Sequence, residues 1–308
     1  MCGAPAIREA RKKKVVFYMI TVYGDDSSDD QQKRSFAVAA LVGKQEAWDS
    51  LELHWKEKIG GVQYHATDCL GGYGVYRGWS KTKRYSLHND LTRLITAFPI
   101  VGHACVIDLP SFAEVFHGVT RTDRFLYCFA HMLGGACLLV RSYNVLHEKD
   151  QNTQRAKFVF DSDNDKFNAG YLYSALKKLK QWHELMQDCD GPVEFAFPRD
   201  KPVGIQAADI WAYEVRNEFD NKVKGIDVTT DASRLFSLEC HRFNRNEYFR
   251  ADMLKTKERI NQMGGNAEYL CAYKEWLRKY RRQDNASSKI AFLEIWDAQI
   301  RRSVASSQ

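Results

Sequence analysis

The feature that most constrains the fold is an alternation of two kinds of apolar segment. Short segments rich in Val, Ile, Phe and Tyr are typical of buried strands, and longer segments with apolar residues at helical spacing are typical of amphipathic helices. The expected strands are residues 14–23, 35–43, 100–108, 156–161 and 193–197, and the expected helices are residues 45–58, 83–98, 122–143, 168–186 and 204–219. A hairpin followed by alternating helices and strands indicates an α/β fold whose mixed five-stranded sheet is flanked by helices.

Chain length and composition fit one such domain with additions at its two ends. With 308 residues, of which 44% are hydrophobic, the chain can bury a large core. We expect a basic N-terminal tail at residues 1–13 and the α/β domain at residues 14–222. Residues 223–308 begin with a linker-like segment and continue with helical patterns, so they are predicted to form a helical C-terminal appendage.

The positive charge of the chain is concentrated in that appendage. The formal net charge is +6, and residues 240–308 contain fourteen Lys and Arg against eight Asp and Glu. A basic segment beside an acidic site suits a polyanionic partner such as nucleic acid, DNA or RNA. A solvated helical face would carry the same charges.

Cysteine spacing and hydropathy narrow the class of protein. None of the eight cysteines forms a Cys-x-x-Cys pair, which argues against a zinc ribbon and against a thioredoxin-type redox motif. The basic start lacks the apolar stretch of a secretory signal, and the apolar stretch around residues 132–140 is too short to cross a bilayer. We therefore expect a cytoplasmic protein that does not associate with membranes.

Three acidic sites lie far apart in the sequence, each at the edge of an apolar segment or within one. Asp25 and Asp26 follow the first strand, Asp161 ends the fourth, and Asp209 lies inside the apolar helix GIQAADIWAYEV. Carboxylates brought together from different elements are the oxygen ligands that hard divalent cations prefer. The same acids could instead close turns, or pair with Arg and Lys in a purely structural cluster.

The helix around Asp209 carries the strongest signal. Gln206 and Asp209 are three residues apart and therefore share a helix face. A carboxylate within an apolar helix is costly to bury without a partner, which a metal ion or a basic side chain would supply. The segment FDSDNDK is not a calcium loop, because Lys166 and Leu172 stand where such loops place Gly and Glu.

In this order, the motifs YGDDSSDD, SFAVAALVG, YHATD, VFDSD and IQAADIWAY resemble the family named domain of unknown function 3800 (DUF3800), which is placed in the ribonuclease-H-like superfamily. The resemblance covers about residues 15–219. The usual Asp-Glu-Ser-Gly opening of that family is replaced here by Asp-Asp-Ser-Ser at residues 25–28.

The resemblance implies a ribonuclease-H-like fold and a metal-binding set of Asp25, Asp161 and Asp209, with Asp26 as a possible fourth ligand. It places the family's histidine at His65, which could transfer a proton or orient a ligand, or be structural. The remaining motif residues, Ser27 and Gln206, are expected to support the metal ligands.

The implied activity is divalent-metal-dependent phosphodiester hydrolysis, with two Mg²⁺ or Mn²⁺ ions as cofactors. A nuclease of this kind needs no side-chain nucleophile. The altered first motif leaves open an alternative, a module that keeps the fold and binds nucleic acid or a protein partner without catalysis.

A second group of candidates combines aromatic and basic side chains. Aromatic faces stack on bases while cations meet phosphates, as single-stranded nucleic acid requires. Such a loop could equally fold onto its own domain. The expected nucleic-acid-binding residues are Tyr76, Arg77, Trp79, Lys81, Lys83 and Arg84, together with the basic run Arg278, Lys279, Arg281 and Arg282.

Overall fold

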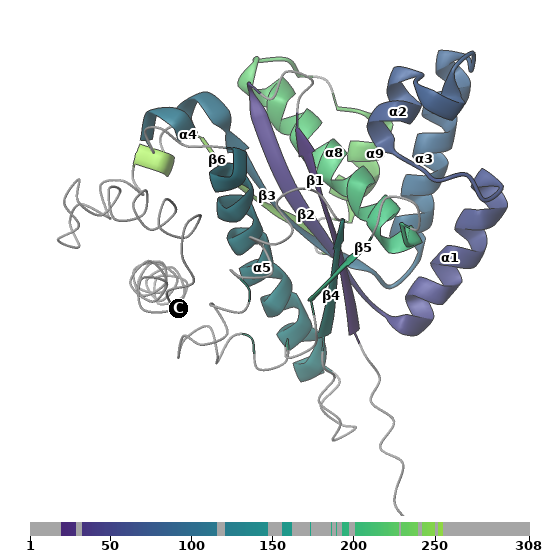
Figure 1. The fold of residues 1–308 in the computed structure, drawn as a ribbon, viewed down its shortest axis with the longest axis horizontal. Coiled ribbons are helices and arrows are strands. Elements are labelled where there is room, and N and C mark those ends of the chain that lie inside the picture. Colours follow the sequence, from purple (N-terminus) through teal and green to yellow (C-terminus); the bar gives the residue numbers. More distant parts are fainter. Residues whose placement is uncertain are drawn as a thin grey trace, which may run out of the picture.

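The computed structural model describes most of the chain up to residue 254. The described residues are 20–28, 33–115, 121–146, 156–161, 193–196, 201–227, 229–239, 242–249 and 252–254, with Tyr173, Met186 and Cys189. They form one mixed sheet with helices on both faces (Figure 1).

The described part of the sheet contains six strands in the order β5-β4-β1-β2-β3-β6. β2 runs antiparallel to its neighbours β1 and β3, whereas β1 and β4, β4 and β5, and β3 and β6 pair in parallel. The strands are β1 (Ile20–Ser28), β2 (Ser35–Lys44), β3 (Val101–Asp108), β4 (Ala156–Asp161), β5 (Val193–Ala196) and β6 (Phe243–Tyr248). All five predicted strands are present, with a sixth added, and the predicted α/β fold with a mixed sheet flanked by helices is confirmed.

The sixth strand corrects the predicted domain boundary at residue 222. β6 pairs with β3, and the short helix α9 (Asp231–Leu238) joins the same core. The ring of Phe236 on α9 lies 4.6 Å from Trp211 and 4.9 Å from Phe243, measured between centroids. The sequence FNRNEY hides this strand because an edge strand with polar side chains lacks an apolar pattern. Residues 255–308, most of the predicted appendage, lie outside the described part.

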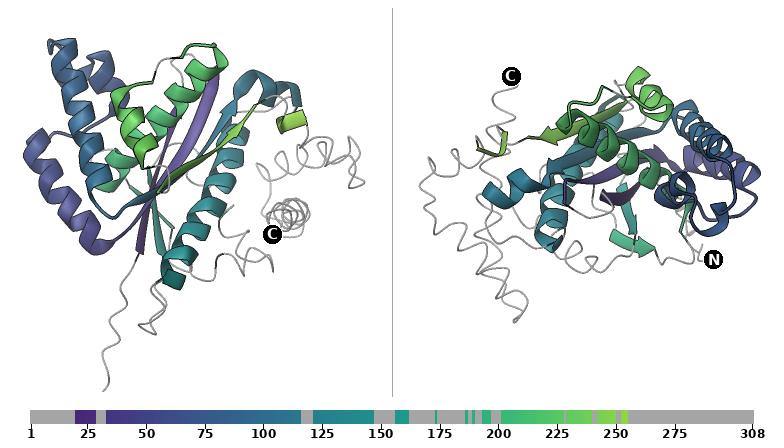
Figure 2. Two further views of the ribbon diagram at one scale, coloured as in Figure 1. Left: turned by 180° about the vertical axis from the view of Figure 1, so that it is seen from behind. Right: turned by 90° about the horizontal axis from the view of Figure 1, so that it is seen from above.

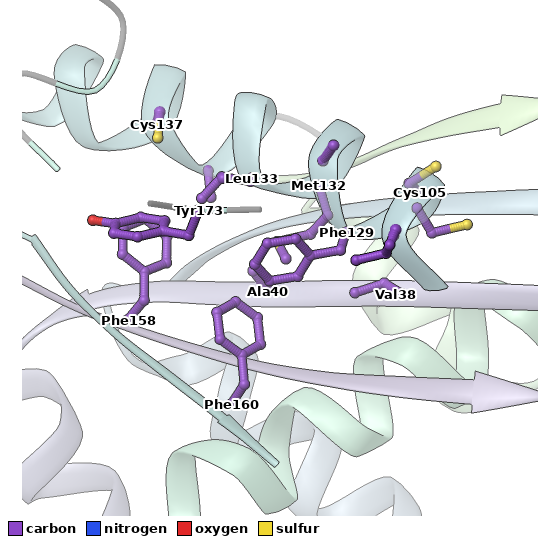
Figure 3. Close-up of a cluster of buried hydrophobic side chains, with 14 of the residues drawn as sticks. Val38, Ala40, Cys105, Phe129, Met132, Leu133, Cys137, Phe158, Phe160 and Tyr173 are labelled. Carbon is purple, nitrogen blue, oxygen red and sulfur yellow. The ribbon is translucent and has the colours of Figure 1, made fainter. Parts of the chain in front are cut away.

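One face of the sheet is covered by α5 (Arg121–Leu146), which follows the short helix α4 (Leu109–Val115). Figure 3 shows the core between this helix and the sheet, where the rings of Phe129 and Phe160 meet edge to face at 5.0 Å. Residues 124–142 of α5 are long and apolar enough to cross a membrane, but 56% of that stretch is buried inside the protein. Core helices that cover a sheet have the same length and composition.

The opposite face is covered by α8 (Val203–Val223), with an outer layer of helices (Figures 1 and 2). This layer comprises α1 (Gln45–Ile59), α2 (Ala66–Gly71), the single-turn helix η1 (Gly74–Tyr76) and α3 (Lys81–Ala97). The first turn of α8 lies very close to β1, because a Cβ atom on Gly204 would come within 2.0 Å of the Tyr23 ring. Glycine at this position lets α8 lie directly over β1.

Candidate functional site

The parallel pairing of two neighbouring strands, β1 and β4, brings Asp25 and Asp161 together. β1 and β4 pair in parallel with Gly24 opposite Phe160, so Asp25 and Asp161 are the next residues on adjacent strands. Because strand side chains alternate between faces, Asp25 shares the α8-facing side with Tyr23. Phe160 packs toward α5, so Asp161 also faces α8. The two acids therefore lie side by side on the α8-facing side of the sheet.

Asp209 reaches the same place from α8. Its side chain is only 4% exposed, and its Oδ2 atom accepts a hydrogen bond from the backbone N–H of Ala66 at 2.6 Å. Ala66 is the first residue of α2, and His65 precedes it. The half-exposed His65 ring lies with Nδ1 3.4 Å from Asp68 Oδ2 and helps to lower the pKa of Asp209. His65 therefore lies near enough to Asp209 to affect its charge, and its catalytic role stays a prediction.

The buried acids repel one another. Burial raises the pKa of Asp25 well above its ordinary value, and the charge of Asp209 raises it further, while Lys201 opposes the shift. Burial also raises the pKa of Asp209, against the lowering effects of His65, the Ala66 N–H and Lys201. These interactions show that Asp25 and Asp209, predicted from distant motifs, share one buried electrostatic environment.

Lys201 is the cation of this cluster, and the sequence analysis did not identify it. Its Nζ atom lies 2.5 Å from Asp161 Oδ2, and the two side chains are 15% and 19% exposed. Burial alone would lower the pKa of Lys201, but the carboxylates of Asp25, Asp161 and Asp209 outweigh burial and raise it. The ammonium group is therefore held in its charged form by all three acids.

Gln206 fixes the backbone that carries this lysine. Its Oε1 atom accepts hydrogen bonds from Tyr64 N at 2.8 Å and from Trp55 Nε1 at 3.2 Å, and its Nε2 donates to Lys201 O at 3.0 Å. The amide thus joins α1, the segment before α2 and the start of α8. These hydrogen bonds thus reach the backbone of Lys201 and not a carboxylate, and the predicted support of metal ligands by Gln206 stays a prediction.

By donor chemistry, Asp25 and Asp209 fit a hard divalent cation, because they offer only carboxylate oxygens and each is destabilised by burial. The geometry of the described residues, however, provides fewer ligands than the predicted set of three acids. Among the described residues, no group of three or more His, Cys, Asp or Glu side chains is positioned to hold a metal ion. The third predicted acid, Asp161, is held by Lys201 instead.

Asp26 does not share the face of the other acids. The sequence predicts that the first strand ends at residue 23, but β1 continues to Ser28, which pairs with Phe36. Alternation along this strand directs Asp26 toward α5, where its charge helps to raise the pKa of the buried Cys128 thiol, after burial and Cys105. Asp26 is therefore badly placed to be a fourth ligand. Ser27 points back toward α8 and accepts a hydrogen bond from Arg216 Nε at 3.2 Å.

Part of the aromatic loop folds onto its own domain, which was the alternative to nucleic-acid binding. Tyr76 is 3% exposed and packs against Tyr64 and Trp79, so it cannot stack on a base without leaving the core. The half-buried Trp79 ring is covered by Lys83, whose Nζ lies 3.7 Å from the ring centroid.

The basic residues near this loop divide into two kinds. Arg84 donates from Nη1 to Leu70 O at 2.7 Å, a contact that caps the end of α2. Arg77 and Lys81 are exposed and remain candidates for phosphate contacts. The basic run Arg278, Lys279, Arg281 and Arg282 lies outside the described residues.

A buried polar network beside the site was also missed. His88 on α3 and Glu214 on α8 are 2% and 1% exposed, with 2.8 Å between Nε2 and Oε1. His88 Nδ1 lies 2.6 Å from the Tyr64 hydroxyl, and Thr230 donates to the second oxygen of Glu214. The only sequence signal was a Glu within the apolar α8 segment, five residues after Asp209.

Comparison with known proteins adds little to this geometry. No protein-family model matches the chain, and no curated protein matches it significantly. Among solved structures, the chain is similar to one described as the PCNA:RNase HII complex from Archaeoglobus fulgidus, with 14% sequence identity and a TM-score of 0.36. That match covers 67% of this chain and 75% of the other. A likeness this weak supports no functional conclusion, and the resemblance to the DUF3800 family stays a prediction.

Proposed function

We propose that this chain is a divalent-metal-dependent nuclease whose centre is formed by Asp25 and Asp209. The observation that carries the proposal is the burial of these two carboxylates in one cluster, where each has a raised pKa. Folding does not require such repulsion, and buried like charges with perturbed pKa values concentrate at functional sites. A substrate or cofactor that is positively charged would relieve it.

Each residue of the site would have a separate role. Asp25 and Asp209 would supply carboxylate oxygens to Mg²⁺ or Mn²⁺, and Asp161 would add a third donor once its ion pair with Lys201 opens. The bound ion would activate a water molecule and neutralise the charge of a phosphodiester. Lys201 would then meet a phosphate oxygen, and His65, half exposed beside Asp209, would move a proton.

The experiment compares cleavage of labelled single- and double-stranded DNA and RNA by the full chain in Mg²⁺, in Mn²⁺ and in EDTA. We expect metal-dependent cleavage that Asp25→Asn and Asp209→Asn each abolish. The matched control is Glu52→Gln, which removes a surface carboxylate paired with Lys56. Equal cleavage by the wild type and both site variants would refute the proposal.

The Lys201–Asp161 ion pair favours a second candidate function. In this case Lys201 is the permanent counter-ion of the acids, and the domain binds nucleic acid without cleaving it. Salt-sensitive binding with no turnover in any divalent metal would support this candidate. Metal-dependent cleavage that disappears in Asp209→Asn would eliminate it.

A further inference from the structure

Arg216 is a buried basic residue on α8 that the acidic cluster does not use. Its side chain is 7% exposed, and its Nε atom donates to Ser27 Oγ at 3.2 Å. The guanidinium carbon lies 5.0 Å from the centroid of the Tyr213 ring. The serine and the aromatic ring together fix the guanidinium group against the end of β1.

The guanidinium has no carboxylate partner within the described part of the chain. The neighbouring acids on α8 are engaged elsewhere, since Glu214 bonds to His88, Glu218 pairs with Arg245 and Asp220 pairs with Arg34. The atoms Nη1 and Nη2 of Arg216 make no hydrogen bond there, yet they are not among the enclosed atoms that lack a partner, so they reach solvent. The guanidinium is always charged, and because most of the side chain is buried, its lack of an anionic partner is costly. An anion from outside the chain would offset that cost.

The position of Arg216 relates it to the acids along both elements. Ser27 follows Asp25 by two residues on the same face of β1, a separation of roughly 6.6 Å at about 3.3 Å per residue. Arg216 follows Asp209 by seven residues on α8, close to two helical turns, so both residues face the sheet. An anion held by Arg216 would therefore lie beside the acidic cluster, in line with the end of β1.

We propose that Arg216 binds a backbone phosphate of a nucleic acid, next to the phosphodiester that faces Asp25 and Asp209. The planar guanidinium, with two free Nη atoms, matches the bidentate geometry of phosphate recognition. This inference rests on the proposed function for its substrate class, but binding through Arg216 requires no metal. It also gives Ser27 a role, because the hydroxyl orients the guanidinium.

The test is binding without catalysis. Binding of fluorescein-labelled single-stranded DNA, and of RNA with the same sequence, is measured by fluorescence anisotropy in EDTA over a series of potassium chloride concentrations. Each phosphate contact to a single strand contributes about 0.7 to the slope of log K against log salt. We expect Arg216→Gln to lower the slope by about that amount, and the exposed-residue control Arg234→Gln to leave it unchanged.

Two outcomes would overturn the inference: the wild type binds neither nucleic acid, or Arg216→Gln folds and keeps the wild-type slope. If Arg216→Gln does not fold, the same binding measurement is made on Arg216→Lys, which keeps the positive charge but loses the planar guanidinium group. Several-fold weaker binding with an unchanged slope then supports the inference, and wild-type affinity contradicts it. If the wild type cleaves in Mg²⁺ but Arg216→Gln keeps the wild-type salt slope, only the role of Arg216 is refuted. If Arg216→Gln lowers the salt slope but the wild type cleaves nothing, only the nuclease proposal is refuted.

Discussion

The Nζ atom of Lys201 lies 2.5 Å from Oδ2 of Asp161, at the position where the sequence leads one to expect a metal ion. The ammonium group interacts with Asp25 and Asp209 as well. One side chain therefore neutralises part of the charge of three acids that come from two strands and a helix.

Removal of Lys201 should make the protein depend on an external cation. In EDTA, Lys201→Gln should lower the free energy of unfolding by about 1–3 kcal/mol, less than for a fully buried pair because both partners are partly exposed. Mn²⁺ should raise the melting temperature of this variant more than that of the wild type, since binding to the folded state stabilises it.

The control for this variant is Lys157→Gln, which breaks the more exposed pair with Glu194 on the neighbouring strand. It should cost less than about 1 kcal/mol and show no special response to Mn²⁺. Urea unfolding and calorimetry measure both quantities. An equal effect of Mn²⁺ on Lys201→Gln and on the wild type would show that no cation enters the site.

Asp25→Asn should stabilise the protein at neutral pH. The pKa of Asp25 is raised in the folded state by burial and by Asp209, so the folded protein binds this proton more tightly than the unfolded chain does. The ionised carboxylate therefore destabilises the fold above its folded pKa, and this penalty fades as the pH falls toward the ordinary value of 3.8.

In EDTA near pH 7.5, we expect the free energy of unfolding of Asp25→Asn to exceed that of the wild type by roughly 0.5–2 kcal/mol. Gains of this size are usual when a substitution removes an unfavourable interaction at a functional site. The difference should shrink steadily toward pH 4. Urea titrations over this pH range measure it. A variant that is less stable than the wild type at pH 7.5 would show that the Asp25 charge is compensated in the fold.

Tyr76→Phe should affect stability and leave nucleic-acid binding unchanged. The hydroxyl of Tyr76 is buried and has no hydrogen-bond partner in the described structure, so its removal should stabilise the fold by up to about 1 kcal/mol. Arg77→Gln, which alters an exposed residue of the same loop, is the comparison for binding. Anisotropy titrations should show weaker binding for Arg77→Gln alone. Weaker binding by Tyr76→Phe would mean that the loop rearranges on the nucleic acid.

The contrast between the predicted and observed sites follows from what an amino-acid pattern contains. Asp25, Asp161 and Asp209 could be found because each interrupts or ends an apolar segment, and strand ends in such a fold meet at one edge. Asp26 was misplaced because its face depends on how far β1 extends. That length is set by pairing with β2, which the polar sequence GDDSS does not reveal.

The partners of the acids were harder to predict than the acids. Lys201 stands in the segment FPRDKP, which resembles a surface loop, and its burial depends on the acids that surround it. Arg216 and Glu214 lie on the same helix as Asp209, but helical spacing does not distinguish a buried charge that has a partner from one that lacks it. Three-dimensional contacts decide that difference, and they come from elements up to 189 residues apart, as between Arg216 and Ser27.

The buried pair His88–Glu214 should be among the most sensitive points of the α8 face. His88→Leu leaves Glu214, 1% exposed, without the imidazole that bonds to its carboxylate. An uncompensated buried charge costs about 3–5 kcal/mol. Replacement of both residues by leucine removes the charge together with its partner, so the double variant should lose less stability than His88→Leu alone.

The measurement is a double-mutant cycle, in which urea unfolding is compared for the wild type, His88→Leu, Glu214→Leu and the double variant. The surface pair Arg93–Asp90 on α3, with Arg93 62% exposed, is the matched control and should give a coupling free energy below about 1 kcal/mol. Additive losses at His88 and Glu214 would contradict the prediction, because independent residues do not couple. A strong coupling would show that the network beneath α3 holds α8, and with it Asp209, in place over the end of β1.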